Sequence, residues 1–189
     1  MTLITGGSGS GKSAYAEDYI QGISKNCHKY YIATMQVFDE EGMKKINRHR
    51  EMRNGKGFET IEQPVRIEEA LKKMKLQGKA CGEEAGCSME TALLECMSNL
   101  AANEMFSREK RGGCEELADR IIDGVKYLNN GLKHLVIVTN NVFEDGILYD
   151  EDTMEYIRLM ALINRKLTEL ADCVTEVVVG IPVMIKKGK

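Results

Sequence analysis

The 189-residue sequence predicts an α/β protein with a mainly parallel, twisted sheet flanked by helices. Short apolar runs alternate with longer helical patterns, which is the order typical of a parallel sheet. The runs are apolar on both faces, as are strands that helices cover on two sides. We expect five strands, at Thr2–Thr5, Lys29–Ala33, Ala92–Cys96, His134–Thr139 and Val174–Val179.

Helices are expected between these strands and after them. In the last helical stretch, Ile157, Ile163 and Leu167 recur close to the spacing of one helix face. Two segments rich in glycine and charge, Gln77–Glu90 and Ser107–Gly113, predict solvated connections. Neither an internal repeat nor a long linker divides the chain, so a single domain over residues 1–189 is expected. The five predicted helices are Ser13–Ile23, Gly42–Arg53, Val65–Met74, Cys114–Leu128 and Thr153–Leu170.

The composition excludes several classes of protein. A hydrophobic content of 43% excludes a disordered chain, and 26 basic against 29 acidic residues argue against a nucleic-acid partner bound through bulk charge. No apolar run reaches the length of a membrane span, and no signal peptide is evident at the start. The six cysteines form no Cys-x-x-Cys pair, and the three histidines show no metal-ligand spacing. We therefore expect a cytoplasmic protein with reduced thiols.

A glycine-rich segment lies between the first apolar strand and the first helix. Glycines allow the backbone to turn successive N–H groups toward one point, and the helix N-terminus adds its dipole. The pattern G-x-x-x-x-G-K-[ST] in this context predicts a phosphate-binding loop, or P-loop. The segment reads Gly6-Gly7-Ser8-Gly9-Ser10-Gly11-Lys12-Ser13.

Two side chains of the loop and one carboxylate predict a nucleotide and Mg²⁺ site. Lys12 would reach the terminal phosphates, and the Ser13 hydroxyl would bind the ion. A P-loop also needs a carboxylate at the end of a neighbouring strand to hold the metal through water, and Glu95 ends an apolar run. The alternative is a glutamate at the sheet edge that faces solvent, but its apolar strand makes an unpaired carboxylate costly there.

Further motifs indicate a particular family. In chain order they are Tyr31-Ile32-Ala33-Thr34, Ile46-Asn47-Arg48-His49-Arg50 with Arg53, Phe58-Glu59-Thr60-Ile61-Glu62-Gln63-Pro64, Leu93-Leu94-Glu95-Cys96 and Val136-Ile137-Val138-Thr139-Asn140. This order resembles the bifunctional adenosylcobinamide kinase/adenosylcobinamide-phosphate guanylyltransferase family of cobalamin synthesis. The resemblance covers nearly the whole chain, apart from the two loops at 77–90 and 107–113.

The resemblance implies two reactions. ATP or GTP, with Mg²⁺, phosphorylates the aminopropanol hydroxyl of the corrinoid adenosylcobinamide. GMP is then transferred from GTP to adenosylcobinamide phosphate through a covalent GMP-histidine intermediate. The same resemblance implies a homotrimer whose active sites lie at subunit contacts.

His49 matches the histidine that carries GMP in this family. The residues support that role independently, because an unperturbed imidazole is largely neutral near pH 7 and has a nucleophilic nitrogen. Arg50 and Arg53 lie beside it, and such cations would attract a triphosphate and disfavour protonation of the imidazole. The alternative is a surface histidine on a basic amphipathic helix. The resemblance also places Glu62 near the guanine nucleotide, where it could instead be a solvated loop carboxylate. Thr34, at the end of its strand, is expected to line the same cleft.

Two other functions stay open at this point. One is a P-loop kinase for a different small molecule, in which His49 is structural. The other is a nucleotide-binding regulatory module without catalysis, which Asn141 and Phe143 favour because the family usually has glutamate and glycine there. GTP labelled at the α-phosphate separates these hypotheses, because only the guanylyltransferase would retain acid-labile label on the protein.

Overall fold

Seven strands form one twisted sheet in the computed structural model, which describes residues 1–24, 27–36, 55–78, 90–107, 112–142, 146–147 and 149–188. The spatial order is β3-β2-β4-β5-β1-β6-β7. All neighbours pair in parallel except β6 and β7, which form an antiparallel hairpin. The strands are β1 Thr2–Thr5, β2 Lys29–Ala33, β3 Phe58–Glu62, β4 Thr91–Glu95, β5 His134–Val138, β6 Cys173–Val178 and β7 Ile181–Lys186.

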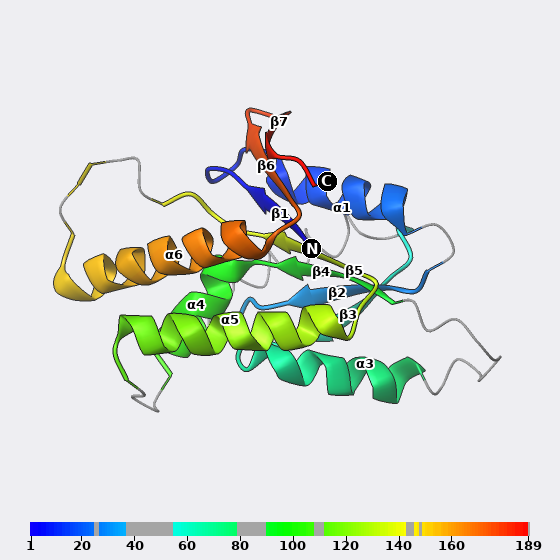
Figure 1. Ribbon diagram of the computed structural model, residues 1–189, viewed down its shortest axis with the longest axis horizontal. Helices are drawn as coiled ribbons and strands as arrows, with labels where there is room; N and C mark the ends of the chain where they lie inside the picture. The colour runs from blue at the N-terminus through cyan, green and yellow to red at the C-terminus, as the bar shows by residue number, and fades with distance from the viewer. Residues whose placement is uncertain are drawn as a thin grey trace.

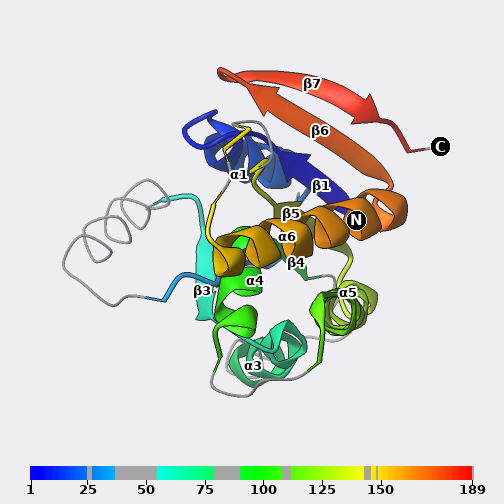
Figure 2. The same cartoon turned by 90° about the vertical axis from the view of Figure 1, so that its left-hand side faces the viewer.

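Helices pack on both faces of this sheet (Figures 1 and 2). Helix α1 (Lys12–Ile23) covers one face, over the central strands β4, β5 and β1. The opposite face is covered by α3 (Ala70–Gly78), α4 (Met97–Met105), α5 (Cys114–Asn130) and α6 (Glu151–Leu170). The expected mainly parallel sheet between helices is therefore confirmed.

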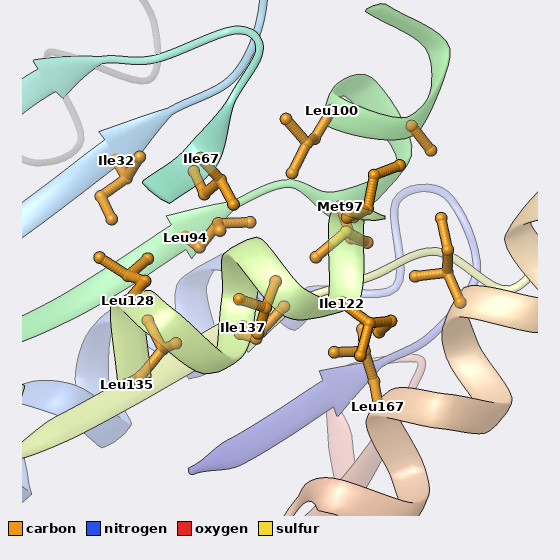
Figure 3. Packing of buried hydrophobic residues seen from close by; sticks show 14 of the residues in the cluster. Ile32, Ile67, Leu94, Met97, Leu100, Ile122, Leu128, Leu135, Ile137 and Leu167 are labelled. Atoms are coloured by element: carbon orange, nitrogen blue, oxygen red, sulfur yellow. The ribbon is translucent and has the colours of Figure 1, made fainter. Parts of the chain in front are cut away.

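The core divides into two apolar layers because side chains alternate across each strand. Leu93 faces α1, where it packs with Ala16 and Ile20, whereas its neighbour Leu94 faces α4 and α5. The second layer is the larger one, and Figure 3 shows it from close by, with side chains of β2, β4 and β5 beside those of α4 and α5. The unbroken apolar runs seen in the sequence are a consequence of this double coverage.

The predicted elements agree closely with those observed. All five expected strands are present, each within one residue of its expected ends, and the helices expected at Ser13, Cys114 and Thr153 are α1, α5 and α6. The stretch Val65–Met74 begins instead as a 3-10 turn over Ile67–Glu69 and continues as α3. The helix expected at Gly42–Arg53 lies outside the described residues.

Three elements were not expected from periodicity, and their positions explain why. Strands β3 and β7 are the two edges of the sheet, so neither is buried on both faces. Edge strands tolerate polar residues and proline, as with Pro182 in β7. The third, α4, begins two residues after β4 ends and has only nine residues, which is too short for a clear helical period.

The described part of the chain bears on two further expectations. None of its helices is long and apolar enough to cross a membrane. Among the described cysteines, Cys96, Cys114 and Cys173 are free thiols. Cys81 and Cys87 lie outside the described residues.

Candidate functional site

The glycine-rich loop connects β1 to α1 at the carboxyl end of the sheet, and its path requires glycine. Gly6, Gly9 and Gly11 have φ angles of 155°, 72° and 89°, which L-amino acids with a side chain rarely adopt. A Cβ atom on Gly6 would lie 2.5 Å from the carbonyl oxygen of Val177 and 2.7 Å from Oγ of Ser10. The loop can therefore follow this path only because no side chain fills the space at Gly6.

Backbone hydrogen bonds fix the loop to two neighbouring segments. Gly180, in the turn between β6 and β7, donates its N–H to the carbonyl of Ser10 at 2.8 Å. Asn141, which follows β5, donates its N–H to the carbonyl of Gly6 at 3.2 Å. The loop is thus held before any ligand arrives, and pre-organisation of this kind lowers the entropic cost of binding.

Lys12 is the first residue of α1, and its side chain folds back over the loop. It is 7% exposed, and its Nζ donates to the carbonyl of Gly7 at 2.9 Å. This contact holds the ammonium group against the loop that leads into the N-terminus of α1. A cation and a helix N-terminus at one place form an anion-binding site.

Ser13 and Glu95 meet although they are far apart in the sequence. The Ser13 hydroxyl donates to Oε1 of Glu95 at 2.5 Å. The expectation that this carboxylate comes from a strand beside β1 is wrong, because β5 lies between β1 and β4. Helix α1 packs over both β5 and β4, and this crossing brings Ser13 to the end of β4.

The residues at this point fit Mg²⁺. Hydroxyl and carboxylate oxygens are the ligands that this ion prefers, and in nucleotide sites it takes one or two protein oxygens, with phosphates and water completing its coordination. A group of three or more acidic, histidine or cysteine side chains suited to a metal is absent from the described residues, so they contain no all-protein cage. Inside the loop, the buried Oγ of Ser10 has no hydrogen-bond partner within the described structure, as expected where an exogenous ligand completes a site.

Thr34 follows β2 and is completely buried, with 0% of its surface exposed. Its hydroxyl donates to the carbonyl of Cys96 at 2.7 Å and accepts the Cys96 N–H at 2.8 Å. Its own N–H donates to the carbonyl of Glu95 at 3.0 Å. The structure therefore places Thr34 against the backbone of Glu95 and Cys96.

Glu62 ends β3 and shares the carboxyl edge of the sheet with Glu95. Ala33 of β2 is in register with both residues, so one strand separates them. The Glu62 side chain is exposed, and its backbone carbonyl accepts from Nζ of Lys73 at 2.7 Å.

The other predicted site residues, His49, Arg50 and Arg53, lie outside the described residues. The chain beyond them is anchored to the helix of the phosphate-binding loop. Lys56 Nζ lies 2.8 Å from Oε2 of Glu17, a carboxylate of α1 that is only 2% exposed. This ion pair connects the segment that precedes β3 to the same helix that carries Lys12 and Ser13.

A polar network at the ends of β4 and β5 was not expected as part of the site. Asn140 Nδ2 donates to Oγ of Ser98 at 2.6 Å, and the Asn140 carbonyl accepts from Nδ2 of Asn164 at 3.1 Å. Tyr156 donates its hydroxyl to the Ser98 carbonyl, and burial raises the pKa of Tyr156 to about 12. Burial also raises the pKa of the Cys96 thiol, so that group is neutral at pH 7. The sequence signal that could have revealed this network is the position of Ser98 and Asn140, polar residues that closely follow the apolar strands β4 and β5.

Known proteins resemble this chain along almost its whole length. The family model of cobinamide kinase / cobinamide phosphate guanyltransferase matches residues 2–185. The chain is 30% identical to the bifunctional adenosylcobalamin biosynthesis protein CobU of Escherichia coli (strain K12), over 98% of this chain and 99% of that protein. It is 29% identical to the protein of the same name from Salmonella typhimurium (strain LT2), with the same coverage.

Solved structures show the same fold at low sequence identity. A solved ATPase domain superimposes with a TM-score of 0.53 and 11% identity, over 93% of this chain and 68% of that one. A DnaB-like replicative helicase gives the same TM-score and identity over 93% of this chain, which spans 46% of the helicase. The fold is therefore that of P-loop nucleoside triphosphatases, with the glycine-rich loop after β1. Because the family model extends over almost the whole chain, this protein belongs to the cobinamide kinase / cobinamide phosphate guanyltransferase family.

Proposed function

We propose that this chain phosphorylates adenosylcobinamide with ATP or GTP and then transfers GMP from GTP to the phosphorylated product. The observation that carries the proposal is one constellation at the carboxyl edge of the sheet. Lys12 lies buried against the phosphate-binding loop, and the Ser13 hydroxyl meets the Glu95 carboxylate beside it. The corrinoid substrate and the second reaction are inferred from the match of residues 2–185 to the family.

In the first reaction, the aminopropanol hydroxyl attacks the γ-phosphorus of the nucleotide. A P–O bond forms to that hydroxyl, the bond to the β-phosphate oxygen breaks, and the nucleoside diphosphate leaves while the hydroxyl proton passes to solvent. N–H groups of the loop orient the triphosphate, and Lys12 neutralises charge on the transferring group. Ser13 and Glu95 would hold Mg²⁺, which supplies further charge neutralisation when it is bound.

In the second reaction, a ring nitrogen of His49 attacks the α-phosphorus of GTP. A P–N bond forms and pyrophosphate leaves. A phosphate oxygen of adenosylcobinamide phosphate then attacks the same phosphorus, and the P–N bond breaks to release adenosylcobinamide-GDP and the free histidine. A covalent intermediate divides one difficult displacement into two easier ones. Arg50 and Arg53 would bind the triphosphate through its charge, and Glu62 belongs to the proposed nucleotide site. Thr34 belongs to the same site as a buried residue whose side chain does not reach the nucleotide.

The proposal includes a cellular and an assembly context. We place the enzyme in the cytoplasm, with all 189 residues in one domain. We also propose a homotrimer, as the family resemblance implies. Its support in this chain is the β6–β7 hairpin, in which six large apolar residues are exposed: Val178, Val179, Ile181, Val183, Met184 and Ile185. Apolar surface gathered in this way is unusual on a monomer.

The decisive experiment uses GTP labelled at the α-phosphate and the variant His49→Ala. Wild-type protein should retain acid-labile label and gain the mass of one GMP, whereas His49→Ala should do neither. The variant should still phosphorylate adenosylcobinamide at close to the wild-type rate, because that step needs no covalent histidine. Loss of a covalent nucleophile removes its pathway, so guanylyl transfer should fall by several orders of magnitude.

The same measurements decide between this proposal and its alternatives. Guanylyl transfer at a near wild-type rate by His49→Ala would rule out the covalent mechanism. Wild-type protein that phosphorylates without forming an adduct would be a kinase alone. Protein that binds nucleotide and does neither would be a regulatory module, with Asn141 and Phe143 as the first residues to restore to the family pattern.

A further inference from the structure

Thr34 makes three hydrogen bonds at the end of β4, and all of them go to the backbone of Glu95 and Cys96. Its N–H donates to the Glu95 carbonyl, while its hydroxyl donates to the Cys96 carbonyl and accepts from the Cys96 N–H. A hydroxyl has one proton to donate, and here that proton is used. Since Thr34 is 0% exposed, its side chain has no route to a nucleotide in this arrangement.

The backbone that Thr34 holds is the one that carries the Glu95 carboxylate. Glu95 is the last residue of β4, so the regular backbone pairing between β2 and β4 ends at this residue. Beyond it, the two hydrogen bonds of the Thr34 hydroxyl continue the pairing of β2 with β4 by one residue. Because these bonds fix the peptide groups on both sides of Cys96, they set the direction in which the Glu95 side chain leaves the sheet, toward Ser13.

Asn103 of α4 holds Thr34 in turn. Its Nδ2 donates to the Thr34 carbonyl at 2.7 Å and to the Pro64 carbonyl at 2.9 Å. One amide thus ties together the chain after β2, the chain after β3 and helix α4. The hydrogen bonds form a continuous path from Asn103 through Thr34 to Glu95 and Ser13.

We propose that Thr34 is a positioning residue for Glu95, whose hydroxyl sets the affinity of the nucleotide-bound enzyme for Mg²⁺ without touching the nucleotide. This inference rests on the proposed nucleotide and metal site. Groups that orient a metal-binding carboxylate typically change metal affinity by about 10- to 100-fold when they are removed. Thr34→Val keeps the shape of the side chain and leaves the N–H and carbonyl of Cys96 without these partners.

The experiment is calorimetric binding of a non-hydrolysable GTP analogue to the full-length chain, first in EDTA and then in a titration with MgCl₂. For Thr34→Val, we expect the Mg²⁺ affinity of the nucleotide complex to fall by about 10- to 100-fold. Nucleotide affinity in EDTA should remain within about threefold of wild type, because no nucleotide contact is lost. Thr34→Ser keeps the hydroxyl and should therefore bind Mg²⁺ with close to wild-type affinity.

Thr91→Val is the matched control for lost stability. Thr91 is the first residue of β4, the strand that Glu95 ends, and it is also 0% exposed. Its hydroxyl donates to the His28 carbonyl, at the end of β4 opposite to Glu95. This variant should lower the unfolding midpoint and leave Mg²⁺ affinity unchanged. A fall in Mg²⁺ affinity in Thr34→Val and not in Thr91→Val therefore reports positioning rather than general weakening.

Three results would overturn the inference. They are unchanged Mg²⁺ affinity in Thr34→Val, an equal fall in Thr91→Val, and weakened nucleotide binding in EDTA, which would mean direct contact with the nucleotide. If Thr34→Val does not fold, Asn103→Ala decides: lowered Mg²⁺ affinity supports the inference, and unchanged affinity rejects it. Glu95→Gln tests the proposed metal site separately from the positioning role of Thr34. If Mg²⁺ affinity is unchanged in Glu95→Gln, the proposed metal site itself is rejected.

Discussion

At the scale of single residues, the candidate site depends on a few side chains in strongly constrained positions. Lys12 is a buried cation held against the loop, and Gly6 occupies a place where even a methyl group meets the backbone of β6. In the proposed function the first residue would supply charge to the phosphates, whereas the second allows the loop to reach its shape. The two can therefore be tested separately.

Lys12→Ala should lower the rate of adenosylcobinamide phosphorylation by about 10²- to 10³-fold, because a pre-organised charge on the transferring phosphate is lost. The measurement is steady-state turnover with ATP and with GTP. Lys126→Ala, which removes an exposed lysine of α5, is the control and should retain full turnover. Wild-type turnover in Lys12→Ala would mean that the loop is not the kinase site.

Gly6→Ala should weaken nucleotide binding at least tenfold and destabilise the fold by about 1 to 3 kcal/mol, since overpacking forces the surrounding backbone to move. The added Cβ lies 2.5 Å from the Val177 carbonyl oxygen. Gly7→Ala is the matched control, because a Cβ there meets no described atom within 4 Å. Equal nucleotide affinities and unfolding midpoints in the two variants would contradict this account.

At the scale of elements, helix α1 is the part that organises the site. It carries Lys12 and Ser13, crosses the sheet above β5, and reaches the end of β4. Its buried Glu17 also anchors Lys56, the residue before Gly57 and β3. The ion pair thus joins the helix of the phosphate-binding loop to the segment that follows the proposed nucleophile in the sequence.

Lys56→Met should destabilise the protein by about 2 to 3 kcal/mol, because it leaves the Glu17 carboxylate buried without its cation. Glu17→Gln together with Lys56→Met should recover most of that loss. Chemical denaturation measures both. Asp18→Asn removes the second partner of Lys56, a carboxylate that is 74% exposed, and should cost less than about 1 kcal/mol.

The same pair predicts a dependence on pH. The hydrogen bond from Lys56 to Glu17 raises the pKa of Lys56 above its ordinary value of 10.5. A raised folded-state pKa gives stability that is complete below the unfolded pKa and is lost as pH rises through the folded one. The difference in unfolding free energy between wild type and Lys56→Met should therefore be constant from about pH 7 to 9 and shrink above pH 10.5. A difference that is unchanged at about pH 11 would contradict the assignment.

At the scale of the whole molecule, the sheet has one polar edge and one apolar edge. Strand β3 has exposed or half-buried residues at most positions, but Ile61 points inward. Strand β7 is exposed along most of its length and is mainly apolar. In the proposed homotrimer this second edge would be covered.

Replacing Ile181 and Ile185 of β7 by lysine should shift the mass in solution from three chains to one, because charges would be buried at the subunit contact. Sedimentation equilibrium measures the mass. Leu76→Lys, at an exposed apolar residue of α3, is the control and should leave the mass unchanged. A monomeric wild-type protein would contradict the trimer, and an unaffected double variant would exclude β7 from the contact.

Local patterns in the sequence were sufficient for the fold class, the five interior strands and the phosphate-binding loop. The reason is that each depends on short-range chemistry. A strand covered on both faces must be apolar throughout, and a loop that wraps a phosphate needs glycines, a lysine and a hydroxyl at set spacings. The edge strands β3 and β7 lacked this signal because half of their surface faces solvent.

Tertiary structure alone decided how the parts of the site meet. The sequence placed Glu95 at the end of a strand, but only the strand order shows that β5 separates it from β1 and that α1 carries Ser13 across to it. It suggested Thr34 as a nucleotide contact, whereas the fold buries its hydroxyl against Cys96. The physical reason is that such contacts join residues about 60 to 80 positions apart, and long-range packing of the sheet and helices, rather than local propensity, brings them together.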